Sequence, residues 1–343
     1  MLPPVFLPVL MQLVVHTKLS LSFTWARAKG AHTHTSVTEN GAWYAVQGYL
    51  GKERASLLKC LTNQPSYAKA VKELVDGNSL TDRDNNMYWQ AWLHFDSELF
   101  DAAHENLVNR RKNAKEAISK KDYSLARKEL GHALHAIQDF YSHSNWIEMG
   151  NKVPSQGTLG TTKDFGVPLA GPDTITCTPC PDFIGQCRNN VITDKLTTAY
   201  YHAEKDPSGR ETKKNGIKCS HGGLADLGIR FKPIGGIGKD SYAAPHGYLH
   251  NEAGKMAEQA SSEFLLDFKR EIAATEFETL MGLNIASCAN GGQSDQQNAS
   301  GGRGQKSGAP SGGRGGRKSS GRGQGQRDST QSRQSGRRGK AKI

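Results

Sequence analysis

Histidine and aspartate residues recur about one helical turn apart between His132 and His143. His135 and Asp139 are four positions apart, so in a helix they lie on one face, about 6 Å apart along the axis. Imidazole nitrogen and carboxylate oxygen both suit zinc, so this pair predicts a metal site. His143 would lie about 12 Å from His135 in a continuous helix. It reaches the same ion only if the helix breaks, and otherwise belongs to a second ion.

Other parts of the chain supply further candidate ligands. We expect His94 and His250 to complete the shell of the first ion, and His34, His143 and His246 to serve a second one. The full set of predicted ligands is His34, His94, Asp96, His135, Asp139, His143, His246 and His250. The alternative is that these side chains only hydrogen-bond one another in a polar seam.

Four of the six cysteines lie close together in the sequence. Their spacing is C-x2-C-x6-C-x31-C, and they are Cys177, Cys180, Cys187 and Cys219. In an oxidising compartment this pattern predicts two disulfides, with three pairings open, whereas in a reducing compartment it would indicate a zinc site. The pairing of Cys60 and Cys288 is also left open.

Motifs of other common enzyme classes are absent from the sequence. It contains no G-x-S-x-G nucleophile elbow, no P-loop and no Rossmann glycine pattern. The clustered cysteines have no neighbouring base, which argues against thiol catalysis. Metal chemistry is therefore the chemistry that the residues indicate.

The apolar residues predict that helices position these ligands. Leu130, Leu134, Ile137 and Tyr141 form one stripe, which predicts a long helix from the N-cap Asp122 to about residue 141. A capping box at residues 36–39 (SVTE) predicts the start of an earlier helix. The remaining expected helices cover residues 67–75, 83–98, 102–120, 193–204 and about 253–279, with long loops at 150–193 and 216–238.

The basic charge is concentrated at the end of the chain. The 343 residues carry a net charge of +11, but residues 289–343 hold 12 of the 44 Lys and Arg, only two acids, 15 glycines and no aromatic residue. This excludes a wholly basic nucleic-acid-binding domain. We expect a disordered tail that binds polyanions such as glycosaminoglycan through charge; a purely solubilising extension is the alternative. Asn298 begins a glycosylation sequon there.

The N-terminus has the pattern of a secretory signal. Residues 5–15 form an uncharged run of 11 residues, which is too short for a membrane-spanning helix, and no later segment qualifies as a transmembrane segment. We expect residues 1–28 to be a signal peptide, cleaved at Ala26-Arg27-Ala28 or at Ser20-x-Ser22; a buried strand is the alternative. Together, the expected signal peptide and the clustered cysteines predict a secreted, extracellular protein.

Several segments resemble one family in the same order. Residues 135–150 (HAIQDFYSHSNWIEMG) are similar to the N-terminal region of the von Willebrand factor A domain-containing protein 7 family. The other similar segments are residues 34–39 (HTSVTE), 93–98 (LHFDSE), the three clustered cysteines, 218–223 (KCSHGG), 235–241 (GGIGKDS) and 245–250 (PHGYLH). The resemblance covers about residues 32–272. Fungal heterokaryon-incompatibility C proteins share a similar helical region.

The adhesive domain that names this family carries a D-x-S-x-S metal motif. That motif does not occur in this sequence, so integrin-like adhesion is not expected of it. The histidine pattern is also similar to that of zinc-dependent phospholipase C and P1-type nucleases, which are helical enzymes with a trinuclear zinc site. His135-x3-Asp139 matches their pattern. Three residues separate Asp139 from His143 where those enzymes have five, and His250 stands in place of a carboxylate.

Together these features predict a mostly α-helical, phospholipase C/P1 nuclease-like domain over residues 29–288. It would have a disulfide-stapled loop region and the disordered tail. One expected function is a non-catalytic extracellular module that holds zinc for stability. The other is a zinc-dependent phosphodiester hydrolase acting on phospholipid or nucleic acid, whose ions would activate water and stabilise phosphoryl charge. The sequence leaves open whether the protein is an enzyme.

Overall fold

The computed structural model describes residues 30–155, 159–180, 186–201, 203–212, 218–222 and 235–290. The expected signal peptide, the tail beyond residue 290 and the sequon at Asn298 lie outside these residues. The described part consists of helices and loops without an extended strand, which confirms the mostly helical prediction. None of its helices is long and apolar enough to cross a membrane.

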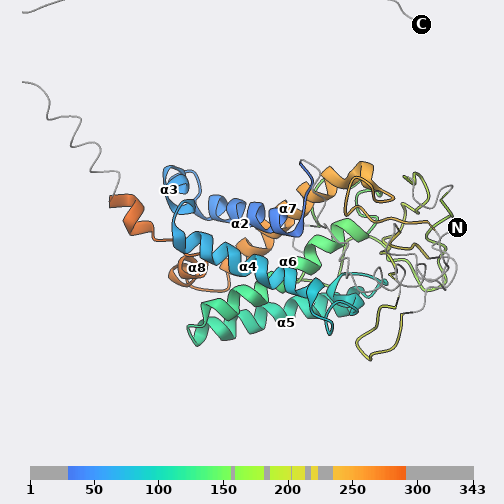
Figure 1. Ribbon diagram of the computed structural model, residues 1–343, viewed down its shortest axis with the longest axis horizontal. Coiled ribbons are helices and arrows are strands. Elements are labelled where there is room, and N and C mark those ends of the chain that lie inside the picture. Colours follow the sequence, from blue (N-terminus) through green and yellow to red (C-terminus); the bar gives the residue numbers. More distant parts are fainter. Residues whose placement is uncertain are drawn as a thin grey trace, which may run out of the picture. The chain divides into compact units, whose positions relative to one another are not determined.

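Helix α6 is the central element of the helical body (Figure 1). The helices are α2 (His34–Leu50), α3 (Leu58–Thr62), α4 (Pro65–Arg83), α5 (Phe100–Ser119), α6 (Tyr123–His143), α7 (His250–Lys269) and α8 (Ala274–Leu280). Short 3-10 turns lie at Ala55–Leu57, Ala91–Leu93 and Gly247–Leu249. Helix α6 packs against α4, α5 and α7, and α2 packs against α7 and α4. The main apolar core lies between these helices.

The start of α6 agrees with its prediction from sequence. The Asp122 carboxylate accepts a hydrogen bond from the backbone N–H of Leu125 at 2.9 Å, which satisfies a donor in the first turn. Every residue from 130 to 143 is buried. The histidines and aspartate in this stretch must therefore find partners inside the protein.

Two glycines let α4 and α6 approach closely. A β-carbon on Gly131 would lie 2.8 Å from the backbone nitrogen of Asn78, and one on Gly77 would lie 2.8 Å from Cα of Lys128. Both distances are too short for real side-chain atoms, so only glycine fits at this crossing. The contact brings the ligand-bearing end of α4 next to that of α6.

Four predicted helices differ from those observed in start, extent or existence. Helix α2 begins at His34, with Thr33 as its N-cap and Ser36 as the partner of Thr33 in the capping box. The box was predicted at residues 36–39, so it lies about one turn earlier than expected. Residues 83–98 and 193–204 are not α-helical beyond the short turn at Ala91–Leu93. The first segment contains left-handed residues that a helix excludes, and the second pairs with other loops through isolated bridges. A turn at residues 270–273 divides the last predicted helix into α7 and α8.

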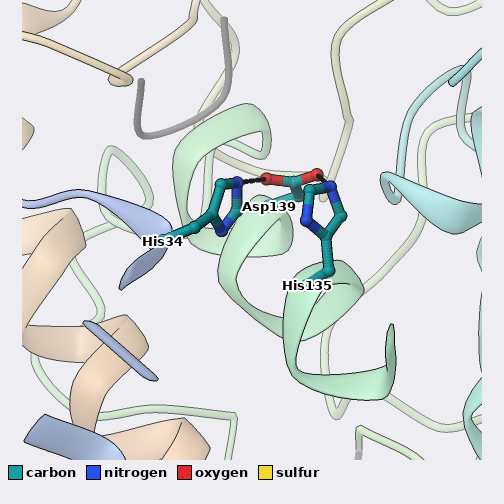
Figure 2. Close-up of side chains that lie close together, drawn as sticks. All are labelled: His34, His135 and Asp139. Atoms are coloured by element: carbon teal, nitrogen blue, oxygen red, sulfur yellow. Dashed lines mark ion pairs between the residues drawn. The ribbon is translucent and has the colours of Figure 1, made fainter. Parts of the chain in front are cut away.

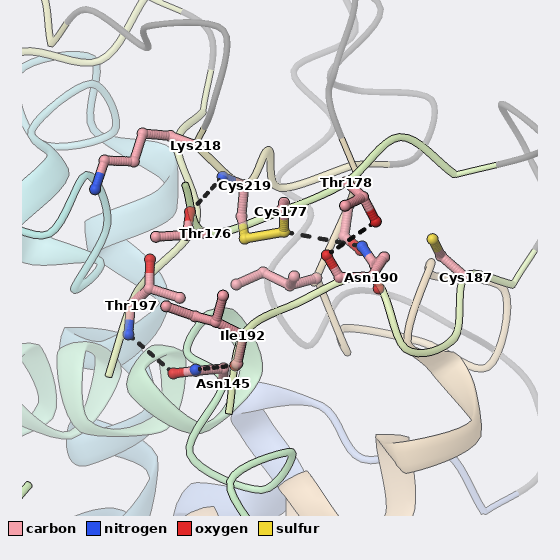
Figure 3. Close-up of a disulfide and its surroundings, with 12 residues drawn as sticks. Asn145, Thr176, Cys177, Thr178, Cys187, Asn190, Ile192, Thr197, Lys218 and Cys219 are labelled. Atoms are coloured by element: carbon pink, nitrogen blue, oxygen red, sulfur yellow. Dashed lines mark hydrogen bonds between the residues drawn. A yellow bond between two sulfur atoms is a disulfide. The ribbon is translucent and has the colours of Figure 1, made fainter. Parts of the chain in front are cut away.

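Disulfides organise the loop region and the end of the body. The pairs are Cys60–Cys288, Cys177–Cys219 and Cys180–Cys187. Figure 3 shows the second pair beside Asn145, the residue that follows the C-cap of α6. Asn145 donates to the carbonyls of Ile192 and Lys195 and accepts from the N–H of Thr197, so it ties the loops to the end of α6.

Candidate metal centre

Asp139 lies at the middle of the first cluster of ligand atoms. Its Oδ1 is 3.2 Å from Nε2 of His34, and its Oδ2 is 2.9 Å from Nε2 of His135, as Figure 2 shows. The same Oδ2 is 3.0 Å from Nδ1 of His94. Three predicted histidines, from α2, α6 and the segment after α4, therefore meet at one buried carboxylate.

Asp82, in the last turn of α4, adds a second carboxylate. Its Oδ1 lies 3.4 Å from Nε2 of His135 and 3.9 Å from Nδ1 of His94, and those two nitrogens are 3.0 Å apart. Ligand atoms around a tetrahedral zinc ion lie about 3.3–3.6 Å from one another. Two overlapping groups, one of His34, His135 and Asp139 and one of Asp82, His94 and His135, could therefore hold a metal ion. Both use Nε2 of His135, which has one lone pair and binds one ion, so together they describe a single site.

Amide side chains orient the imidazole rings of this cluster. Nδ1 of His135 lies 3.2 Å from Oδ1 of Asn78, and Nδ1 of His34 lies 2.7 Å from Oε1 of Gln138. An amide oxygen only accepts hydrogen bonds, so each Nδ1 carries a hydrogen and each Nε2 faces the cluster. Most metal-binding histidines have such an outer partner.

The buried carboxylates make this cluster attractive to a cation. Burial alone would lower the pKa of His135, but the charges of Asp139 and Asp82 outweigh burial and raise it to about 10. Burial likewise opposes ionisation of Asp82, yet the charge of His135 holds its pKa at about 2. The same balance keeps the pKa of Asp139 well below its usual range. Positive charge, carried by protons or by a metal ion, is therefore stabilised here.

A second cluster lies at the C-terminal end of α6. Nε2 of His143 and Nε2 of His221 are 3.1 Å apart. The first lies 3.1 Å from Oδ1 of Asp240, and the second lies 3.1 Å from Oδ2 of the same carboxylate. These three buried residues form a third group that could hold a metal ion. Nδ1 of His221 lies 3.2 Å from the carbonyl of Gly222, which again leaves Nε2 facing the group.

Two acidic residues stand next to the second cluster. Oδ1 of Asp96 lies 3.0 Å from Nδ1 of His143, so Asp96 orients this ring. Glu204 is buried and accepts a hydrogen bond from the hydroxyl of Ser97. Burial and the negative charge of Asp96 raise the pKa of Glu204 well above its usual range. This environment favours the protonated form of Glu204.

The segment that supplies His94 and Asp96 has an unusual backbone. Phe95, Ser97 and Glu98 have φ angles of 55°, 58° and 56°, in the left-handed region that side chains other than glycine seldom adopt. The buried ion pair between Glu98 and Lys218, at 2.8 Å, holds the end of this segment. Such strain persists only where the surroundings enforce it, and it gathers at functional sites.

Both clusters face one open pocket. Its lining residues are Asp82, Tyr88, His94, Asp96, His143, Tyr201, Glu204 and His221. Nε2 of His94 is buried and has no hydrogen-bond partner among the described residues. A buried donor or acceptor without a partner is costly, so this atom supports a site that binds something further.

The structure brings five of the eight predicted ligands into these groups. They are His34, His94, His135, Asp139 and His143. Asp96 lines the pocket as an outer partner of His143. Sequence reasoning missed Asp82, His221 and Asp240.

The last two predicted ligands have other neighbours. Nδ1 of His250 donates to the carbonyl of Lys239 at 2.7 Å, and Nε2 accepts from the N–H of His32 at 3.0 Å. Nε2 of His246 lies 2.7 Å from Oδ1 of Asn190, and its Nδ1 faces Glu148. Both rings are used to hold loop backbone and buried polar side chains, and neither belongs to the three groups.

The missed residues differ in the signal that could have found them. Asp82 has no histidine near it in sequence, and it reaches the site only because α4 and α6 cross. His221 and Asp240 lie in the KCSHGG and GGIGKDS segments, which already resembled the family. Polar residues with no assigned role in these matched loop segments could have indicated that His221 and Asp240 are further ligands.

Comparison with known proteins identifies the family. The family model described as the VWA7 N-terminal domain matches residues 53–278. The von Willebrand factor A domain-containing protein 7 of Homo sapiens is 33% identical over 245 residues, which is 70% of this chain and 25% of that protein. The Mus musculus protein is 35% identical over 201 residues, which is 57% of this chain and 21% of that protein.

No solved structure matches the chain. The matched region spans only about a quarter or less of the length of the curated relatives, so their whole-protein activities are not transferred. The family model nevertheless covers most of the helical body, from residue 53 to residue 278, and α2 precedes the matched part. This chain belongs to the family of the VWA7 N-terminal domain.

Proposed function

We propose that this domain is a zinc-binding module of a secreted protein. The observation that carries the proposal is the convergence of three histidines and two aspartates at the crossing of α4 and α6: His34, Asp82, His94, His135 and Asp139. Mixed imidazole and carboxylate ligands suit zinc, and calcium or magnesium would be expected to take oxygen ligands alone. The oriented rings of His135 and His34 fit such an ion.

A bound ion would stabilise the fold as well as occupy the site. Its binding free energy adds to the free energy of unfolding, because the unfolded chain does not assemble these ligands. The proposal therefore predicts that zinc content and thermal stability change together. A polar seam of ion pairs alone would not respond to a chelator.

The test is elemental analysis of protein purified without chelator, followed by EDTA treatment and thermal melting. Zinc should be present in stoichiometric amounts, and its removal should lower Tm. His135→Ala should lower both zinc content and Tm, with little further effect of EDTA. His132→Ala removes another buried histidine from α6, outside the three groups, and should leave zinc content unchanged. Protein without stoichiometric metal that takes up no zinc would contradict the proposal.

A second candidate function is hydrolysis of a phosphodiester. The observation that favours it is the pocket faced by both clusters, because a purely structural ion needs no adjoining cavity. Bound ions would activate water and neutralise charge on the phosphoryl oxygens. Glu204 lines the same pocket, and its protonated form can donate a hydrogen bond to an oxygen of a bound ester. Parallel phospholipase and nuclease assays of zinc-loaded protein, with His135→Ala as the inactive control, test this candidate.

Secretion and polyanion binding are further parts of the proposal. Three disulfides in a body of this size support an oxidising compartment. Intact mass of protein secreted from cultured cells should show a processed N-terminus and no free thiol.

Deleting residues 289–343, most of which lie outside the described part, should abolish retention on heparin resin at low salt. Equal retention of the truncated protein would place polyanion binding elsewhere.

A further inference from the structure

Two aromatic side chains line the pocket, and a third packs against them at its edge. Tyr88 and Tyr201 line it, and their hydroxyl oxygens lie 3.1 Å apart. The Trp89 ring packs against both, with centroid distances of 4.6 Å to Tyr88 and 6.4 Å to Tyr201. We call Tyr88, Trp89 and Tyr201 the aromatic wall. None of the three is needed as a metal ligand.

Backbone hydrogen bonds hold the aromatic wall in place. The N–H of Lys205 donates to the carbonyl of Trp89 at 2.7 Å, and the N–H of Ala91 donates to the carbonyl of Lys205 at 3.1 Å. These bonds join the segment after α4 to the segment that carries Tyr201 and Glu204. The wall is therefore preformed, which lowers the entropic cost of binding a ligand.

Trp89 is exposed although it is large and apolar. The residue is 36% exposed. Its ring packs against Tyr88 and Tyr201, which both line the pocket. Tryptophan on a surface beside a polar pocket offers a face for a ligand. An exposed Trp89 contributes little to the stability of the apolar core.

We propose that the aromatic wall binds the planar base of a nucleotide unit whose phosphate lies at the metal centre. This inference rests on the proposed metal-binding function and names the ligand class of the same pocket. Each base of a single-stranded nucleic acid or a free nucleotide offers a flat π-face for stacking. The ions and the protein N–H and O–H groups beside them would take the phosphate.

The arrangement of the rings favours a flat ligand over a quaternary ammonium head group. Trp89 and Tyr201 are nearly parallel, with an interplanar angle of 27°, whereas Tyr88 meets both rings at steep angles. The exposed indole of Trp89 offers one flat surface on which a planar ring can stack, while an aromatic cage surrounds a cation from several directions.

The surroundings also favour a nucleotide over a phospholipid. An enzyme that works at a membrane is expected to present several apolar side chains around its pocket. Of the large apolar side chains that are exposed in the described residues, Trp89 alone lies in the segments 82–96 and 199–204 that form the pocket. A lipid-binding rim is thus missing from these segments.

The test is calorimetric titration of the zinc-loaded full-length protein with AMP, inorganic phosphate, phosphorylcholine and a six-residue single-stranded phosphorothioate deoxyadenylate. AMP should bind about five- to hundredfold more tightly than phosphate, as stacking of one base predicts. Trp89→Ala should reduce AMP affinity to near that of phosphate and leave phosphate affinity unchanged. Tyr44→Ala, which removes another exposed aromatic ring from α2, is the matched control.

The outcomes separate the inference from the proposed function. Equal affinity for AMP and phosphate, or tightest binding of phosphorylcholine, would overturn the base-binding wall while leaving the metal centre intact. Absence of zinc from the protein, measured on the same sample, would overturn both. Tighter binding of the oligonucleotide than of AMP would identify a nucleic acid as the source of the nucleotide unit, and equal binding would identify a free nucleotide.

Discussion

Nδ1 of His94 lies 3.0 Å from Nε2 of His135, although the two residues are 41 positions apart in sequence. Two imidazole nitrogens approach this closely only when a proton or a metal cation lies between them. Asp82 and Asp139 face both nitrogens and stabilise that positive charge. The strained segment after α4 and the buried face of α6 are therefore joined at one electrostatic centre.

The second cluster should hold its own ion. His221→Ala removes one of the three ligands of that group but none of those around Asp139. We therefore expect the zinc-to-protein ratio, measured by elemental analysis and native mass spectrometry, to fall by about one equivalent. His104→Ala removes a buried histidine of α5 outside the clusters and should not change the ratio. An unchanged ratio in His221→Ala would mean that His143 and Asp240 hold no ion.

The sequence predicted the ligands that one helix brings together. His135 and Asp139 follow from helical spacing, and the N-cap at Asp122 follows from local hydrogen bonding. Asp82 could not be predicted in this way, because its place in the site depends on the crossing of α4 and α6. Local periodicity contains no information about such non-local contacts.

The loop ligands were hidden for a different reason. His221 and Asp240 come from irregular segments whose positions are set by bridges, disulfides and buried pairs. The left-handed residues at 95–98 likewise carry no strong sequence signal, since none of them is glycine. Tertiary contacts overcome local preference there, which is why a helix was wrongly expected over residues 83–98.

His132 should make the fold sensitive to acid. Burial lowers its pKa to about 3, whereas the unfolded chain protonates it near pH 6.5. Below pH 6.5 the unfolded state binds a proton that the folded state does not, so the free energy of unfolding falls as pH falls. Between pH 7 and pH 5 the free energy of unfolding should fall by about 2 kcal/mol for this reason.

The measurement is urea unfolding at both pH values, with chelator present to remove metal effects. His132→Gln keeps a polar partner for the Thr81 hydroxyl, which His132 now contacts at 3.0 Å. The variant should lose about 2 kcal/mol less than the wild-type protein on acidification. Parallel pH dependence in the two proteins would show that His132 is protonated in the folded state.

The crossing of α4 and α6 should not tolerate a larger residue at Gly131. In Gly131→Ala the new methyl group meets the carbonyl of Leu74 and the backbone nitrogen of Asn78. Backbone cannot move aside as a flexible side chain can, so we expect a loss of about 1–3 kcal/mol in unfolding free energy. Chemical denaturation measures this loss.

Gly48→Ala is the control for Gly131→Ala. Its new methyl group meets only the flexible end of the Leu266 side chain, and alanine is the better helix former. This variant should be neutral or more stable than the wild-type protein. Equal effects of the two substitutions would show that the close helix crossing is not required.

The disulfides should differ greatly in their contribution to stability. Cys60 and Cys288 are 228 positions apart, and their bond ties α3 to the end of the described body, whereas Cys180 and Cys187 are only 7 positions apart. A cross-link restricts the unfolded chain more when it closes a longer loop, so the chain-entropy model gives roughly 5 kcal/mol for the first bond and roughly 2–3 kcal/mol for the second. Replacing both cysteines of a pair with serine and measuring denaturant midpoints tests this difference. A larger loss on removal of Cys180–Cys187 would mean that this bond acts mainly on the folded state, where Asn190 contacts Cys180, and that restriction of the unfolded chain is the smaller effect.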